Sequence, residues 1–149
     1  MSATAFLQLR DALAAHLMAA PALAGVPVYA GRVRPIAQEE ASAINLRLSD
    51  SQAMTSVIEA HDWHTTVLID CAARSVPGGD DADTVVDGLL GQVFSSLRDF
   101  GPAGLGLLDP ADEAAVEWDR DADDVPYTCA SLRITVVHRT PAATLQPWT

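Results

Sequence analysis

The chain has 149 residues, 49% of them hydrophobic, and a formal net charge of -11 at pH 7. This length is enough for one domain with its own core, and no apolar run approaches the roughly 20 residues that span a bilayer, so we expect a soluble, globular protein. The acidic balance argues against a protein that holds nucleic acid by neutralising its phosphates. The two cysteines, Cys71 and Cys129, match no metal-binding spacing, which favours reduced thiols in a cytosolic setting.

The first 25 residues are rich in alanine, but their apolar residues follow a helical period. Phe6, Leu9, Leu13 and Leu17 fall on one face, which predicts an amphipathic helix that Pro21 ends. We favour this helix over a secretion signal because the segment has no positively charged start and charged or polar side chains interrupt its apolar part.

Strand patterns follow this helix. Residues 26–33 have the β-branched and aromatic content of a strand, and residues 35–42 resemble a polar loop. In residues 43–49, Ile44, Leu46 and Leu48 alternate with Asn45 and Arg47, as in a half-buried strand. Residues 50–62 are ambiguous, and we interpret them as a hairpin excursion.

The segment His61–Ser75 contains His61, His64 and Asp70, residue types that bind metals or transfer protons. A metal site would need the two histidines to converge, which a three-residue spacing achieves on a helix but not on a strand. The β-branched run favours a strand, so we expect no metal site. One face should then carry Val67, Ile69 and Cys71, and the other Thr66, Leu68, Asp70 and Arg74.

A second helix should follow the turn at residues 76–83, whose aspartates suit a helix N-terminus. Its apolar stripe consists of Val86, Leu89, Leu90, Val93, Leu97 and Phe100. Gly101 is placed where a C-terminal cap should be. Gly88 and Gly91 each cost about 1 kcal/mol inside a helix, and close packing on the sheet would explain them.

Two more strands complete the pattern. In residues 114–121 we expect Val116 and Trp118 to face inward and Glu117 and Asp119 outward. In residues 127–139, Leu132, Ile134 and Val136 oppose Ser131, Arg133 and Thr135. Such alternation predicts an α+β two-layer sandwich: a mainly antiparallel sheet of about four to five strands with two main helices packed on one face. Residues 1–141 form the single domain and residues 142–149 a C-terminal tail.

The acidic run from residue 109 to residue 124 contains a DxDxD pattern at Asp119, Asp121 and Asp123. It resembles the start of a calcium loop, but Asp124 stands at the sixth position and Ala130 at the twelfth, where glycine and glutamate are needed. Weak divalent binding by a crowded loop and a solvated hairpin both stay open. We assign no catalytic residue, no metal ligand and no cofactor.

The order of several phrases resembles a known family. They are "ALAAHLMAAPALAG", "VYAGRVRPIAQEEASAINLRL", "DWHTTVLIDCAARS", "DADTVVDGLLGQVFSSL" and "VEWDRDADDVPYTCASLRITVVHRTP". Over residues 7–141 the layout is similar to the tail terminator proteins of long-tailed phages and prophages, the minor tail protein U class. The resemblance implies a non-enzymatic structural subunit of the virion tail, assembled in the host cytoplasm as a hexameric ring.

Such a ring would end polymerisation of the major tail tube protein and join a head-completion protein, with DNA passing through unbound. The alternatives are a head-tail connector and, from another class, a small metal-dependent hydrolase. Ring subunits need complementary surfaces, and the polar sheet face and tail offer candidates: Arg47, Asp70, Arg74, Glu117, Asp119, Arg133, Arg139 and Trp148. These side chains could equally be solvated. A lumen lined by Asp119, Asp121, Asp123 and Asp124 would repel DNA phosphates.

Overall fold

The computed structural model describes residues 2–98, 100, 107–108, 114–121 and 126–148, without the side chains of residues 55–57, 107–108 and 121. The helices are α1 (Ala5–Met18), the short 3₁₀ helix η1 (Pro21–Leu23) and α2 (Ala82–Leu97). The strands are β1 (Val28–Ala30), β2 (Ser42–Val57), β3 (Ala60–Arg74), β4 (Leu107–Leu108), β5 (Ala115–Asp121) and β6 (Tyr127–Pro141).

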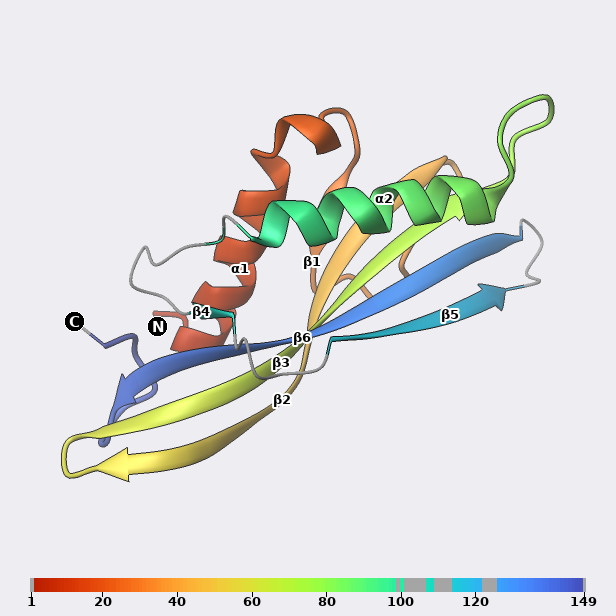
Figure 1. Cartoon of the computed structure of the whole chain (residues 1–149). Helices are drawn as coiled ribbons and strands as arrows, with labels where there is room; N and C mark the ends of the chain where they lie inside the picture. The colour runs from red at the N-terminus through yellow and green to blue at the C-terminus, as the bar shows by residue number, and fades with distance from the viewer. Residues whose placement is uncertain (1, 99, 101–106, 109–113, 122–125, 149) are drawn as a thin grey trace.

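One mixed sheet forms the base of the fold (Figure 1). Its order is β1-β2-β3-β6, and both β4 and β5 pair with the far edge of β6. Among the described strands, only β1 runs parallel to its neighbour, and the connection from Ala30 to Ser42 returns the chain to the same end of the sheet. Figure 1 shows α1 and α2 on the same side of the sheet. The predicted two-layer α+β sandwich is therefore confirmed, and residues 50–62 form the β2–β3 hairpin.

The core lies between the helices and one face of the three long strands. Leu9, Leu13 and Leu17 of α1 are completely buried there, as the helical period predicted. Val67 and Ile69 of β3 are also completely buried. Their strand partners in the core come from β2 and β6, on the predicted faces: Ile44, Leu46, Leu132, Ile134 and Val136.

Helix α2 begins as predicted but ends earlier. Asp81 is the N-cap, and its carboxylate accepts a 2.8 Å hydrogen bond from the backbone N–H of Thr84. The helix stops at Leu97, so Phe100 packs against the core from beyond its end, and Gly101 lies outside the described residues.

The close packing expected of the α2 glycines is wrong. Both Gly88 and Gly91 are exposed, and a Cβ at either position would meet nothing within 4 Å. The helix presents these residues to solvent and buries the stripe that contains Val86 and Val93.

Two other expectations hold only in part. Val116 and Trp118 lie on the helix side of β5, because they pair with the core residues Leu132 and Ala130, but they remain 42% and 43% exposed. Helix α2 contacts β3 and β6 but does not cover Val116 and Trp118. The segment 35–42 is not simply a polar loop, since Ile36 is buried in a small second cluster.

Among the described residues, no helix is both long enough and apolar enough to cross a membrane.

Candidate assembly interface

The sheet face opposite the helices, here called the open face, collects most of the predicted interface residues. Strand register places Asn45, Asp70, Ser131 and Glu117 in one row across β2, β3, β6 and β5. The next row consists of Arg47, Leu68, Arg133 and Ala115. The register thus brings side chains from four strands close together. Arg47 and Arg133, for example, are 86 residues apart in the sequence but lie in the same row.

Asp70 anchors the centre of the open face. Its carboxylate accepts hydrogen bonds from Arg47 at 2.9 Å (Nε) and 3.3 Å (Nη2), and from the Ser131 hydroxyl at 2.5 Å. The Asp70 side chain is only 5% exposed, whereas that of Arg47 is 49% exposed. Hydrogen bonding to Asp70 raises the pKa of Arg47. The buried carboxylate of Asp70 therefore fixes the position of the half-exposed Arg47 guanidinium on this face.

Three charged residues around this pair remain exposed. Arg133 is exposed and forms no ion pair with any described residue. Glu117 and Asp119 of β5 are exposed as well. The open face consequently displays both signs of charge, with the cations on β2 and β6 and the anions at the β5 edge.

Arg74 lies at one end of this face, beneath the loop of residues 31–41. It is 8% exposed, and its guanidinium donates to the backbone carbonyl of Ala37 at 2.9 and 3.3 Å. The cation also lies 5.4 Å from the ring centroid of Tyr127. Arg74 is therefore one of the residues that attach the 31–41 loop to the sheet.

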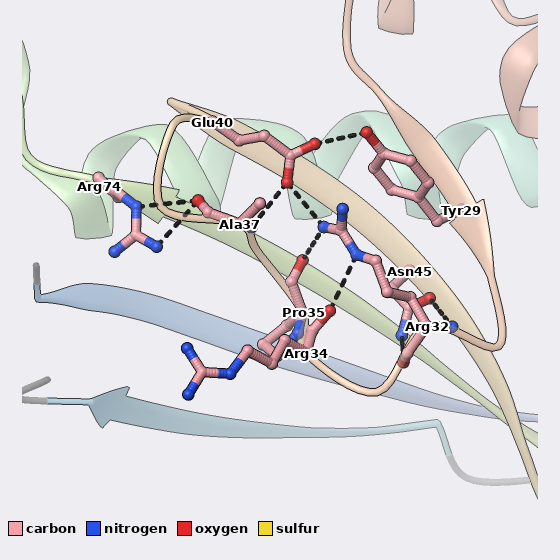
Figure 2. A network of polar contacts seen from close by, with 8 residues as sticks. All are labelled: Tyr29, Arg32, Arg34, Pro35, Ala37, Glu40, Asn45 and Arg74. Atoms are coloured by element: carbon pink, nitrogen blue, oxygen red, sulfur yellow. Dashed lines mark hydrogen bonds and ion pairs between the residues drawn. The ribbon is translucent and has the colours of Figure 1, made fainter.

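The loop itself is held by a polar network around Arg32 and Glu40 (Figure 2). Glu40 accepts from Tyr29 at 2.5 Å, from Arg32 at 2.8 Å and from the backbone N–H of Ala37 at 2.7 Å. Burial acts to raise the pKa of Glu40, but these hydrogen bonds outweigh it and lower that pKa to about 2. The side chain of Asn45 bridges the backbone N–H and C=O of Arg32. This ordered loop was missed by sequence reasoning, because its partners are scattered from residue 29 to residue 74.

Arg139 and Trp148 lie at the opposite end of the sheet. Arg139 forms a two-pronged ion pair with Asp62, at 2.6 and 3.0 Å, and stacks 5.6 Å from the Trp148 ring centroid. Hydrogen bonding to Arg139 lowers the pKa of Asp62. The tail returns to its own domain: Trp148 N–H donates to the Arg139 carbonyl, and the Leu145 carbonyl accepts from the N–H of Ala5 at the start of α1. Trp148 nevertheless stays 41% exposed.

The arginine within the acidic run, Arg120, forms its ion pair outside the run. Arg120 pairs with Asp83 of α2, which also accepts a 2.8 Å hydrogen bond from Thr128. Of the predicted lumen residues, Asp119 is exposed and Asp121 is described only by its backbone in β5. Asp123 and Asp124 lie outside the described residues.

The two histidines of the 61–75 segment do not converge. His61 pairs with Thr140 and His64 with Val137 in an unbroken register, so the two side chains lie on opposite faces of β3. No group of three or more His, Cys, Asp or Glu residues that could hold a metal occurs in the described part of the chain. Both cysteines are buried free thiols.

A third histidine, His138, has the more unusual setting. It is 5% exposed, hydrogen-bonds Thr65 through Nε2 at 2.6 Å and meets the Phe6 ring edge-on at 5.3 Å. Burial lowers the pKa of His138 to about 4. Its Nδ1 has no hydrogen-bond partner among the described residues. The alternation of β6 places His138 on the same face as Leu132, Ile134 and Val136, so the sequence pattern could have predicted that it faces the core.

No protein-family profile matches the chain, and no curated protein matches it. The chain is similar to a solved structure described as "Cryo-EM Structure of an Extracellular Contractile Injection System, PVC sheath/tube terminator in extended state". The identity is 11% and the TM-score 0.49, and the alignment covers 100% of this chain and 62% of that one. The chain thus spans less than two thirds of the length of the chain it resembles.

Proposed function

We propose that this protein is a structural subunit of a phage or prophage tail, which forms a ring at the end of the tail tube. The ring stops polymerisation of the major tail tube protein and offers the surface that a head-completion protein joins. Six copies is the number that the sequence resemblance implies. The protein acts in the virion tail and is assembled in the host cytoplasm.

The open face is the observation that carries this proposal. It is a long sheet surface without helices, on which Arg47 is fixed by buried Asp70 while Arg133 and Glu117 stay exposed. A surface with preset charges of both signs suits a protein neighbour, because complementary charges fix register and exclude wrong partners. Together with the sequence resemblance over residues 7–141, it favours a subunit of an assembly over a hydrolase.

Exposed and buried members of the predicted interface have different roles in this proposal. Arg133, Glu117 and Asp119 contact a neighbouring subunit directly, and Trp148 does so from the tail end. Asp70 and Arg74 are buried, so they support the surface from beneath by positioning Arg47 and the 31–41 loop. The acidic residues Asp119, Asp121, Asp123 and Asp124 line the lumen and repel DNA phosphates.

Mass measurement in solution tests the ring. Native mass spectrometry should detect a species of six times the 15.7 kDa chain. A strict monomer at every concentration, alone and with tube protein, would contradict the proposal.

Tube assembly tests the position of the ring. Adding the protein to polymerising tail tube protein from the same gene cluster should shorten the tubes and leave one ring at a tube end, seen by negative-stain microscopy. Unchanged tube lengths, together with binding to isolated heads, would instead identify a head-tail connector.

A further inference from the structure

We propose that one end of the sheet contacts the last ring of tail tube protein. This surface, here called the apolar end, consists of the exposed side chains Leu7, Met54, Ile58 and Leu145. The inference rests on the proposed function and names the part of the molecule that faces the tube. The apolar end is separate from the open face, so its tests can fail while the ring stands.

Three separate parts of the chain supply these exposed side chains. Ile58, in the turn between β2 and β3, is 97% exposed, and Met54 on the adjoining part of β2 is 58% exposed. Leu145 of the C-terminal segment and Leu7 at the start of α1 are exposed as well. Strand register brings the turn and the C-terminal segment together, since the first residue of β3 pairs with the last residue of β6. In Figure 1 the turn, the start of α1 and the end of β6 lie at the same end of the molecule.

Backbone hydrogen bonds hold the three parts against each other. The Glu59 carbonyl in the turn accepts from the N–H of Ala142 at 2.9 Å. The Leu145 carbonyl accepts from the N–H of Ala5 at 2.7 Å, which joins the C-terminal segment to α1. A surface that is already ordered loses less conformational entropy when it binds, so these bonds favour its use as a contact.

The charges at this end are mostly paired within the chain. Asp62 of β3 accepts two hydrogen bonds from Arg139 of β6, at 2.6 and 3.0 Å. Glu59 contributes one exposed carboxylate beside Ile58. A partner can therefore cover the exposed apolar side chains without separating the Asp62–Arg139 pair.

The opposite end of the sheet has a different character. Asp80 and Asp81, in the turn that follows β3, are exposed, and so is Asp87 of α2. Asp119, close to the end of β5, is exposed too. Figure 1 shows the start of α2 and the end of β5 at this end of the molecule, away from the β2–β3 turn. Burying such carboxylates against a partner costs free energy unless each one meets a cation.

The partner at the tube end selects between the two ends. Each new ring of tube protein buries the surface that the tube end exposes, and surfaces that stay buried in permanent assemblies are more apolar than ordinary protein surface. A protein that stops polymerisation covers that same surface in place of the next ring. The apolar end fits this partner, and the acidic end points away from the tube.

Thiol protection tests the contact directly. The thiol of the Ile58→Cys variant should react with a maleimide about tenfold more slowly when the protein is bound to tubes of purified tail tube protein. Val76→Cys, at an exposed apolar position just beyond the other end of β3, is the matched control and should react equally fast in both states. The native thiols give little background, because burial raises the pKa of Cys71 to about 12 and that of Cys129 to about 11. An unprotected Ile58→Cys thiol, or protection at Val76→Cys instead, would overturn the proposal.

Introduced charges provide an independent test. Ile58→Glu and Leu145→Glu should each raise the protein concentration that halves the mean tube length by about tenfold or more. Both side chains are exposed, so the urea midpoint of unfolding and the ring seen by native mass spectrometry should not change. Val76→Glu is the matched control and should cap tubes as the wild-type protein does.

The outcomes separate this inference from the proposed function. If wild-type protein caps tubes and both apolar-end variants cap equally well, the apolar end is wrong while the proposed function stands. If the variants lose the ring itself, the apolar end joins copies of this chain, and the proposal is overturned. If wild-type protein never caps tubes, the proposed function fails and this inference fails with it.

Discussion

The Arg47–Asp70 pair gives the sharpest stability prediction. Substitution Arg47→Ala leaves a carboxylate that is 5% exposed with the Ser131 hydroxyl as its remaining side-chain partner. Two charges about 4 Å apart attract by about 4 kcal/mol at an effective dielectric constant of 20. Because half of the Arg47 side chain is in water, solvent screening reduces this value. We expect the free energy of unfolding to fall by about 2 to 3 kcal/mol.

Urea unfolding followed by tryptophan fluorescence or circular dichroism measures this loss. For a chain of this size the predicted change corresponds to a fall in Tm of roughly 5 to 10 °C. Arg133→Ala is the matched control, since it removes an exposed arginine from the next strand but one and should change stability by less than about 0.5 kcal/mol. Equal effects of the two variants would show that Asp70 is hydrated in the folded protein and would refute the reasoning.

Three further predictions concern the core, one helix cap and pH. Ile134→Ala should cost about 2 to 5 kcal/mol in urea unfolding because it opens a cavity in the main core, while His64→Ala should cost little; equal losses would contradict the assignment of faces. Asp81→Ala removes the side-chain cap of α2 and should lower the free energy of unfolding by about 1 kcal/mol, whereas Asp81→Asn should retain most of it. His138 keeps a pKa of about 4 when folded against an ordinary 6.5, so the unfolded chain binds the proton first and stability should drop as the pH falls from 6.5 to 4. The loss should be of order 3 kcal/mol, and a His138→Gln variant whose stability has the same pH slope over this range would exclude His138 as its source.

Local sequence patterns fixed which side chains share a face. Alternation in residues 61–75 placed Val67 and Ile69 with the core and separated His61 from His64, as the β3 register shows. The i, i+3, i+7 spacing likewise determined the buried stripe of α1. These predictions succeed because the periods of strands and helices are properties of the backbone itself.

Whether a face is covered was decided by segments distant in sequence. Trp118 points to the helix side as predicted, but α2 lies over β3 and β6, so the side chain remains half-exposed. Arg74 points to the open face, yet the 31–41 loop buries it through Ala37. No local pattern reports such cover, since it depends on where a helix or loop from elsewhere in the chain comes to rest.

Composition, periodicity and cap residues were thus sufficient for the fold class, the helix positions and the parity of each long strand. The tertiary structure alone decided the parallel pairing of β1, the Asp70–Arg47–Ser131 cluster and the burial of Arg74 beneath the 31–41 loop. The physical reason is that alternation specifies direction within one element, whereas burial, ion pairing and grooves arise only when several elements are placed against each other.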